Sequence, residues 1–151
     1  LDPKRARTWM GRGLIYSELG AEALSAGRSP EESYKRAISD ISRALSIDSE
    51  LSDAWANRGN VRTNLAYFRG QNGEESSALF EIAREDLERA IELNPAEYRY
   101  WYYRGASRAL YAGILFSRGE DCLAVLERAE NDLEKALTFE PDDYLIVLSE
   151  D

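Results

Sequence analysis

Apolar and polar residues alternate with a helical period over much of the chain. Tyr34, Ala37, Ile41, Ala44 and Leu45 follow one another at steps of three, four, three and one. Because an α-helix has about 3.6 residues per turn, such residues share one face, and the polar residues between them point away from it. The pattern therefore predicts an amphipathic helix over this stretch.

The same pattern returns twice, each time after 46 residues, and Trp9, Trp55 and Trp101 occupy one column of the repeat. The other columns with one residue type in all three copies are Arg12, Arg58, Arg104; Gly13, Gly59, Gly105; Gly27, Gly73, Gly119; Ala37, Ala83, Ala129; Asp40, Asp86, Asp132; and Ala44, Ala90, Ala136. A fixed period of this length is typical of stacked repeats, in which each unit buries its apolar face against its neighbours.

Each copy is predicted to be a helical hairpin with two helices of about 18 residues, or about 27 Å. The first helix begins near the tryptophan, and the column of Gly27 suits a left-handed C-terminal cap. In the first copy Ser29 is the expected N-cap of the second helix, with Pro30 at its first position and Glu32 closing a capping box. The expected fold class is all-α, an α-α superhelix of three hairpins with long helices.

The alignment of the copies also gives expected boundaries within a single array. Residues 1–5 are the expected tail of a preceding repeat, because Leu1, Asp2 and Pro3 align with Leu93, Asn94 and Pro95. Repeats are expected at 6–51, 52–97 and 98–143, and the start of a following element at 144–151.

Composition argues against several classes of function. The chain has no histidine, which removes the commonest general base and metal ligand, and its single cysteine, Cys122, allows no internal disulfide. We therefore expect no enzyme, no catalytic or metal site and no cofactor. A net charge of −9 argues against binding to nucleic acid. No stretch is apolar enough for a membrane span, and the lone cysteine favours an intracellular setting, with the cytoplasm as the default.

The segments "WANRG" and "AREDLERAIELNP" combine Trp, Arg-Gly, two alanines seven apart and a proline five residues further on. This combination resembles the tetratricopeptide repeat, and three copies in register strengthen the resemblance. The ordinary repeat has about 34 residues, so the copies here resemble an extended variant with about 12 more, which we expect to lengthen both helices. The resemblance implies a non-enzymatic scaffold whose first helices line a concave groove that binds a peptide or a partner segment.

The positions that line this groove in the family can be transferred to the present sequence. The expected groove residues are Met10, Leu14, Asn57, Asn60, Asn64, Arg99, Tyr102, Tyr103 and Ala106. The same family positions include Ala56 and Thr63, whereas Tyr100 is expected to pack against the preceding hairpin. Some family members grip a C-terminal carboxylate through five residues. Here those positions hold Met10, Leu14, Asn57, Arg99 and Tyr103, of which only two are compatible, so that clamp is not predicted.

Charge differs between the two helices of each copy. Residues 6–26, 52–72 and 98–118, which cover the first helices, carry net charges of 0, +2 and +4. Two interpretations follow for Arg104 and Arg108. They either pair with second-helix acids such as Asp132 and Glu134, or they make the groove electropositive and attractive to an acidic segment.

Two other functions compete with peptide binding. The array could be a structural module that self-associates or docks a subunit through its ends, where apolar segments such as "YLIVL" occur. Single-stranded nucleic-acid binding through Tyr and Arg of the third copy is the less favoured alternative.

Overall fold

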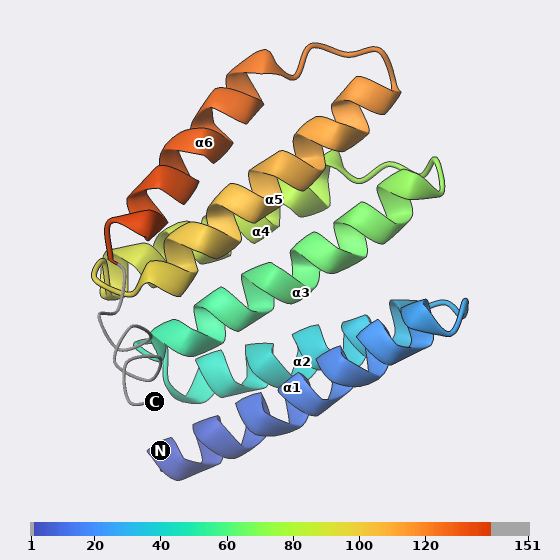
Figure 1. Cartoon of the computed structure of the whole chain (residues 1–151). Helices are drawn as coiled ribbons and strands as arrows, with labels where there is room; N and C mark the ends of the chain where they lie inside the picture. The colour runs from blue at the N-terminus through green and yellow to red at the C-terminus, as the bar shows by residue number, and fades with distance from the viewer. Residues whose placement is uncertain (1, 140–151) are drawn as a thin grey trace, which may run out of the picture.

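The computed structural model describes residues 2–139, which form six α-helices arranged as three antiparallel hairpins (Figure 1). The helices are α1 (Pro3–Ser25), α2 (Glu31–Ile47), α3 (Ser52–Gln71), α4 (Ser77–Leu93), α5 (Tyr98–Ser117) and α6 (Leu123–Leu137). No strand occurs in this part of the chain, which confirms the expected all-α class. The element expected at 144–151 lies outside the described residues.

The first helices α1, α3 and α5 run side by side, and the second helices α2 and α4 lie behind them (Figure 1). The helix starts keep the spacing of the sequence repeat, because α3 begins at Ser52 and α5 at Tyr98. The helices α3 and α5 have 20 residues each, and α2 and α4 have 17 each, close to the expected length. None of the six described helices combines the length and apolar character that a membrane crossing requires.

The turn inside each hairpin is set by a glycine in the left-handed region, as expected. Gly27, Gly73 and Gly119 have φ values of 70°, 79° and 73°. The residue after each glycine donates its N–H to a carbonyl five residues earlier, as in the 2.8 Å bond from Arg28 to Ala23. This bond satisfies a carbonyl that the end of the helix would otherwise leave open.

The start of α2 differs from the predicted capping box. The N-cap is Pro30 and not Ser29 as expected, so Pro30 precedes the first helical position, although Ser29 Oγ still accepts the N–H of Glu31 at 3.3 Å. Glu32, however, bonds Arg36 one turn further on, at 3.0 Å, and does not reach back to the cap. The box is wrong because a favourable (i, i+4) ion pair competes for the same carboxylate.

Close approach of the helices within each hairpin depends on the glycine column of Gly13. A Cβ atom placed on Gly59 would lie 2.7 Å from Leu87 Cγ and 3.0 Å from the Ala83 carbonyl oxygen, both on α4. The equivalent atom on Gly105 would lie 2.9 Å from Leu133 Cγ on α6. Only glycine allows this spacing, because each pair of helices would have to separate to accept a methyl group.

The tryptophans are partly buried and pack against the hydrophobic clusters. Trp55 and Trp101 are half-buried, and their indole N–H groups donate to Ser49 O at 2.8 Å and Pro95 O at 3.0 Å. The guanidinium of Arg58 lies 4.9 Å from the Trp55 ring centre, and Arg104 lies 5.1 Å from that of Trp101. Each ring therefore packs beneath an arginine and holds it in place.

In every hairpin, a buried aspartate of the second helix binds this arginine through both carboxylate oxygens, and the pair forms a clasp between the two helices. Arg58 donates Nε and Nη2 to the two carboxylate oxygens of Asp86 at 2.9 and 2.7 Å, and Arg104 makes the same pair of bonds with Asp132. Arg12 binds Asp40 in the same way. Asp86 is only 3% exposed, so its charge depends on this partner.

Replacing Asp86 with alanine is expected to lower the free energy of unfolding by about 3–5 kcal/mol, because the Arg58 and Arg62 guanidinium groups would remain poorly hydrated without their counter-ion. Urea titration followed by circular dichroism measures the change. Asp40→Ala should cost less, because the Arg12 side chain is 56% exposed and can be hydrated. The control Glu32→Ala, which removes an exposed ion pair, should leave stability unchanged. Equal losses for Asp86→Ala and Glu32→Ala would contradict this assignment.

Two glycine substitutions should act in opposite directions. Gly59→Ala is expected to destabilise the chain by about 1–3 kcal/mol, because the new methyl group forces α3 away from α4. In Gly113→Ala the Cβ atom would meet nothing within 4 Å, so the gain in helix propensity should stabilise α5 by about 0.5–1 kcal/mol. Thermal unfolding of both variants tests the pair, and a Gly59→Ala variant as stable as the wild type would show that α3 and α4 can accept the methyl group.

Candidate functional site

The expected groove residues lie on the three first helices. All nine are at least partly accessible, and Arg99 and Tyr102 are exposed. Asn57 of α3 reaches Met10 of α1, with its amide nitrogen 3.8 Å from the sulfur, which joins these two helices across the face. Asn60 and Asn64 follow Asn57 at helical spacing, so the three amides form a row along α3.

Tyr102 and Tyr103 differ in their surroundings on α5. Tyr102 is 51% exposed, which leaves half of its ring available to a partner. Tyr103 is half-buried and packs against the cluster of Ala56, Leu87 and Tyr100. The two rings lie 6.0 Å apart at an interplanar angle of 54°. Tyr102 is therefore the accessible aromatic residue of the pair, and Tyr103 supports it.

Two of the transferred groove positions do not line a surface. Ala56 is 1% exposed and packs in a cluster with Leu87 of α4 and Tyr100 of α5, and Thr63 is 3% exposed. Thr63 Oγ1 donates to Ser107 Oγ of α5 at 2.8 Å. These positions are wrong as groove residues because α5 packs closely enough on α3 to cover them.

A group of hydrogen-bonded side chains, the latch, joins α3 to α5 beside Arg99. These hydrogen bonds were not predicted from the sequence. The Tyr100 hydroxyl donates to Asp53 Oδ1 at 2.6 Å and lies 3.0 Å from Ser52 Oγ. Tyr100 is 2% exposed, which confirms the expected packing against the preceding hairpin. Burial, together with the bond to Asp53, raises the pKa of its phenol to about 12.

Arg99 is exposed but already has anionic neighbours. Its guanidinium bonds Glu97 at 3.1 Å and Asp53 at 3.2 Å. The hydrogen bond with Glu97 raises the pKa of Arg99 and lowers that of Glu97. The charge at this end of α5 is therefore largely compensated, although 45% of the Arg99 side chain remains accessible.

The remaining arginines of α5 point away from the groove face. Arg104 and Arg108 both bind Asp132 of α6, and Arg108 does so at 2.5 Å, which confirms the pairing interpretation for Asp132. Burial lowers the pKa of Arg108, while Asp132 acts in the opposite direction. Arg118, the residue just after α5, donates to the Glu74 carbonyl oxygen at 2.7 Å. The net charge of residues 98–118 thus overstates the positive charge that the groove face offers.

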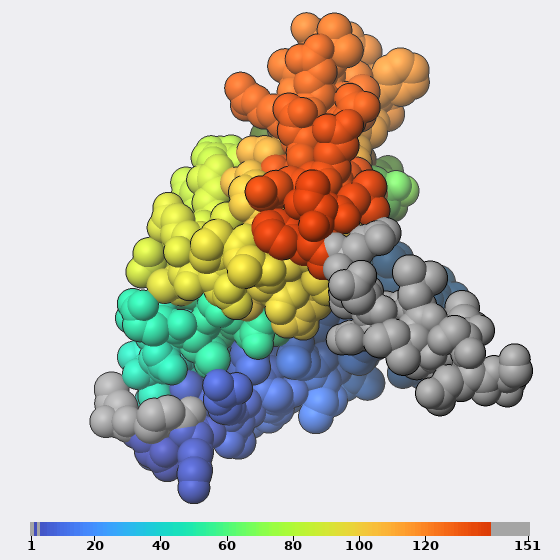
Figure 2. Space-filling model, turned by 60° about the vertical axis from the view of Figure 1, so that its left-hand side comes forward, coloured from blue at the N-terminus to red at the C-terminus, as the bar shows by residue number. Residues whose placement is uncertain are grey.

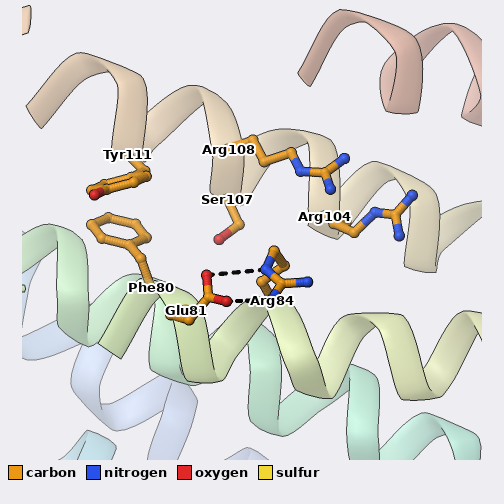
Figure 3. Close-up of a pocket in the computed structure, with 7 residues that line it drawn as sticks. All are labelled: Phe80, Glu81, Arg84, Arg104, Ser107, Arg108 and Tyr111. Atoms are coloured by element: carbon orange, nitrogen blue, oxygen red, sulfur yellow. Dashed lines mark hydrogen bonds and ion pairs between the residues drawn. The ribbon is translucent and has the colours of Figure 1, made fainter. Parts of the chain in front are cut away.

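A small cavity lies on the other side of α5, between this helix and α4 (Figure 3). The Phe80 and Tyr111 rings close one end of it, 4.9 Å apart, and Arg84 binds Glu81 and Glu88 at the other. Its volume of about 40 Å³ holds one or a few water molecules and is far below that of a small-molecule site. Among the described residues, no cluster of acidic, histidine or cysteine side chains could hold a metal ion.

Comparison with known proteins supports the architecture. No family model matches the chain, and no curated protein matches it. Among solved structures it is similar to the first TPR of Spaghetti (RPAP3) bound to HSP90 peptide SRMEEVD, with a TM-score of 0.54 and 24% identity over 94% of this chain and 84% of that chain. The fold is therefore a tetratricopeptide-like array of helical hairpins, as the sequence resemblance implied.

The latch predicts how stability responds to alkaline pH. The unfolded phenol loses its proton near its ordinary pKa of 10, whereas the folded one keeps it to about 12. A group whose folded pKa is raised contributes stability below the unfolded pKa and loses it as pH rises through the folded one. The stability contributed by Tyr100 should therefore fall between pH 10 and 12.

The matched variant Tyr100→Phe removes the titrating group. We expect it to cost about 1 kcal/mol at neutral pH, through loss of the bonds to Asp53 and Ser52. Above pH 10, where the phenol begins to titrate, the difference from the wild type should shrink. Urea unfolding at both pH values measures this, and a constant difference would show that Tyr100 titrates normally.

Proposed function

We propose that this chain is a non-enzymatic interaction scaffold that binds an extended peptide or partner segment along the faces of α1, α3 and α5. The observation that carries the proposal is the accessible row on these helices, from Met10 through Asn60 and Asn64 to Tyr102. Among the described residues, no cluster of side chains could hold a metal ion. A surface with amides at its centre and an aromatic ring at one end suits recognition of a chain segment.

The asparagines are the proposed contacts to the main chain of the bound segment. A side-chain amide has two donors and an acceptor, so it can bond both groups of a peptide unit. Asn60 and Asn64 are half-exposed on successive turns of α3. Their rise of about 6 Å along the helix is close to the spacing of alternate residues in an extended chain. The proposal therefore favours an extended segment over a helical one.

Tyr102 and Arg99 are the proposed anchors for side chains of the bound segment. Tyrosine and arginine are enriched among the residues that dominate binding energy. An acidic side chain would share Arg99 with Asp53 and Glu97, so charge adds selectivity at one position and modest affinity overall. We propose a segment with one acidic residue placed near Tyr102, not a uniformly acidic one.

The solved neighbour binds the HSP90 peptide SRMEEVD. At the five positions through which some members of the family grip a C-terminal carboxylate, this chain has Met10, Leu14, Asn57, Arg99 and Tyr103, and the Asn57 amide already contacts Met10. Two apolar residues replace polar ones at one end of the clamp. We therefore propose that the ligand is an internal segment of a partner, which binds in the same groove but not through a C-terminal carboxylate.

The repeat of 46 residues is proposed to be an extended form of the tetratricopeptide unit, with repeats at 6–51, 52–97 and 98–143. We also propose an intracellular, cytoplasmic setting, for which the lone cysteine remains the argument. Single-stranded nucleic acid is less favoured as a ligand, because Arg104 and Arg108 are both bound to Asp132.

Selection from a displayed library of random peptides tests the groove. Selected peptides are expected to bind the wild-type chain and to lose more than about tenfold in affinity for the double variant Tyr102→Ala with Arg99→Gln. Both residues are exposed, so the variant should keep its helicity and melting temperature.

Ile82→Glu, an exposed change on the outer face of α4, is the matched control and should bind as the wild type does. An acidic residue that recurs at one position, with affinity that falls moderately in salt, would support the role of Arg99. Peptides that bind the double variant as well as the wild type would place the interface elsewhere and refute the groove.

A further inference from the structure

The outer face of α1 exposes apolar residues whose counterparts in the next repeat are buried. Ile15 is 61% exposed and Leu19 is 46% exposed. The residues 46 positions later, Val61 and Leu65, are 1% and 3% exposed and pack in one cluster with residues of α2 such as Ile41. The same side of the first helix is thus covered by a preceding hairpin in α3 but open in α1, among the residues that the structure describes.

A hollow of about 270 Å³ lies on the same helix, lined by Arg5, Thr8, Trp9 and Arg12. The counterpart of Thr8 in the third repeat is Tyr100, which packs in a cluster with Ile91 of the preceding α4. The hollow is therefore the place where a residue equivalent to Ile91 would insert. Its volume is that of a large side chain with some space around it. A side chain of a helical partner would fill the hollow.

The opposite end of the array carries the complementary residues. Leu126 and Leu137 of α6 are 44% and 66% exposed. Their counterparts one repeat earlier, Phe80 and Ile91, are 4% and 8% exposed because α5 covers them. Figures 1 and 2 show α1 and α6 at opposite ends of the stack of helices. The described residues therefore present both halves of an interface that they form twice internally.

The internal interfaces also show which residues would meet. Phe80 of α4 packs against Tyr111 of α5, and the residues at these positions in the end helices are Leu126 and Leu19. By the same correspondence, Leu137 would enter the hollow beside Thr8. An apolar side chain would face each exposed apolar position of α1.

The charged residues agree with the same pairing of positions between α6 and α1. The Arg58 Nη1 atom donates to Ser42 Oγ of α2 at 3.0 Å, and Arg104 Nη1 lies 4.0 Å from Glu88 Oε1 of α4. In each case the first-helix arginine reaches the preceding second helix. The corresponding residues of the end helices are Arg12, whose side chain is 56% exposed, and Glu134 of α6, which is exposed. A basic residue on one end thus matches an acidic residue on the other.

From this correspondence we propose that the α1 face binds the α6 end of a second copy of this chain, so that copies stack head to tail. The contact repeats the packing of α2 on α3 and of α4 on α5, with Leu126 on Leu19, Leu137 in the hollow and Arg12 beside Glu134. Such a contact uses two different surfaces, so each added copy leaves one of each kind free, and the assembly grows beyond a dimer. It is independent of the peptide groove, which lies on another side of the first helices.

Sedimentation velocity of the wild-type chain from about 1 µM to about 1 mM tests the association, a range that covers contacts of moderate affinity. The average mass is expected to rise with concentration through dimers to larger species. Leu19→Glu and Leu126→Glu, each of which places a charge in the proposed contact, should both sediment as monomers. The control Ile82→Glu, equally exposed but on the outer face, should associate like the wild type.

A mixture of the two blocked variants gives the decisive result. Leu19→Glu keeps an intact α6 end and Leu126→Glu keeps an intact α1 face, so equal amounts should form a dimer and nothing larger. A Leu126→Glu variant that still dimerises by itself would indicate a symmetric contact of two α1 faces and would overturn the proposal. A wild-type chain that stays monomeric to about 1 mM would also overturn it, and would leave the α1 face to a different helical partner.

Discussion

The clasp between an arginine of the first helix and a buried aspartate of the second helix organises every hairpin of this chain. Each clasp is bidentate and joins residues 28 apart, as between Arg58 and Asp86. A buried carboxylate without a counter-ion is costly, so the two helices can pack only in the register that brings the arginine to it. The tryptophan beneath the guanidinium and the glycine one residue after the arginine complete the arrangement. The clasp thus fixes the hairpin geometry from which the other surfaces follow.

The clasp also decides the character of the groove. Arg104 and Arg108 appear in the sequence as positive charge on a first helix, but Asp132 binds both, and their heads point into the hairpin. What remains on the groove face is a row of amides, an exposed tyrosine and one compensated arginine. Such a face recognises a ligand mainly through hydrogen bonds and ring contact, and its binding should depend less on salt than that of a strongly basic groove.

Because the array repeats, the contacts of its internal hairpins show what the exposed surfaces at its two ends are suited to bind. The same position of the repeat is buried when a neighbouring hairpin covers it and exposed when none does, as Val61 and Ile15 show. The burial of the internal copies therefore identifies what an end surface is suited to bind. In this chain the two ends carry matching apolar and charged residues, which is the physical basis of the proposed stacking.

The sequence by itself determined the hairpins, their 46-residue spacing and the glycine turns, because helical period and left-handed caps are local properties of the chain. The resemblance to the tetratricopeptide repeat placed Tyr102 among the groove positions, and the ring is 51% exposed. Only the tertiary structure decided that Ala56 and Thr63 are covered, that the tryptophans lie beneath arginines, and that Arg104 and Arg108 share Asp132. These outcomes depend on how closely neighbouring helices approach and on which acid a long side chain reaches some 24 to 28 residues away, and no local pattern specifies either.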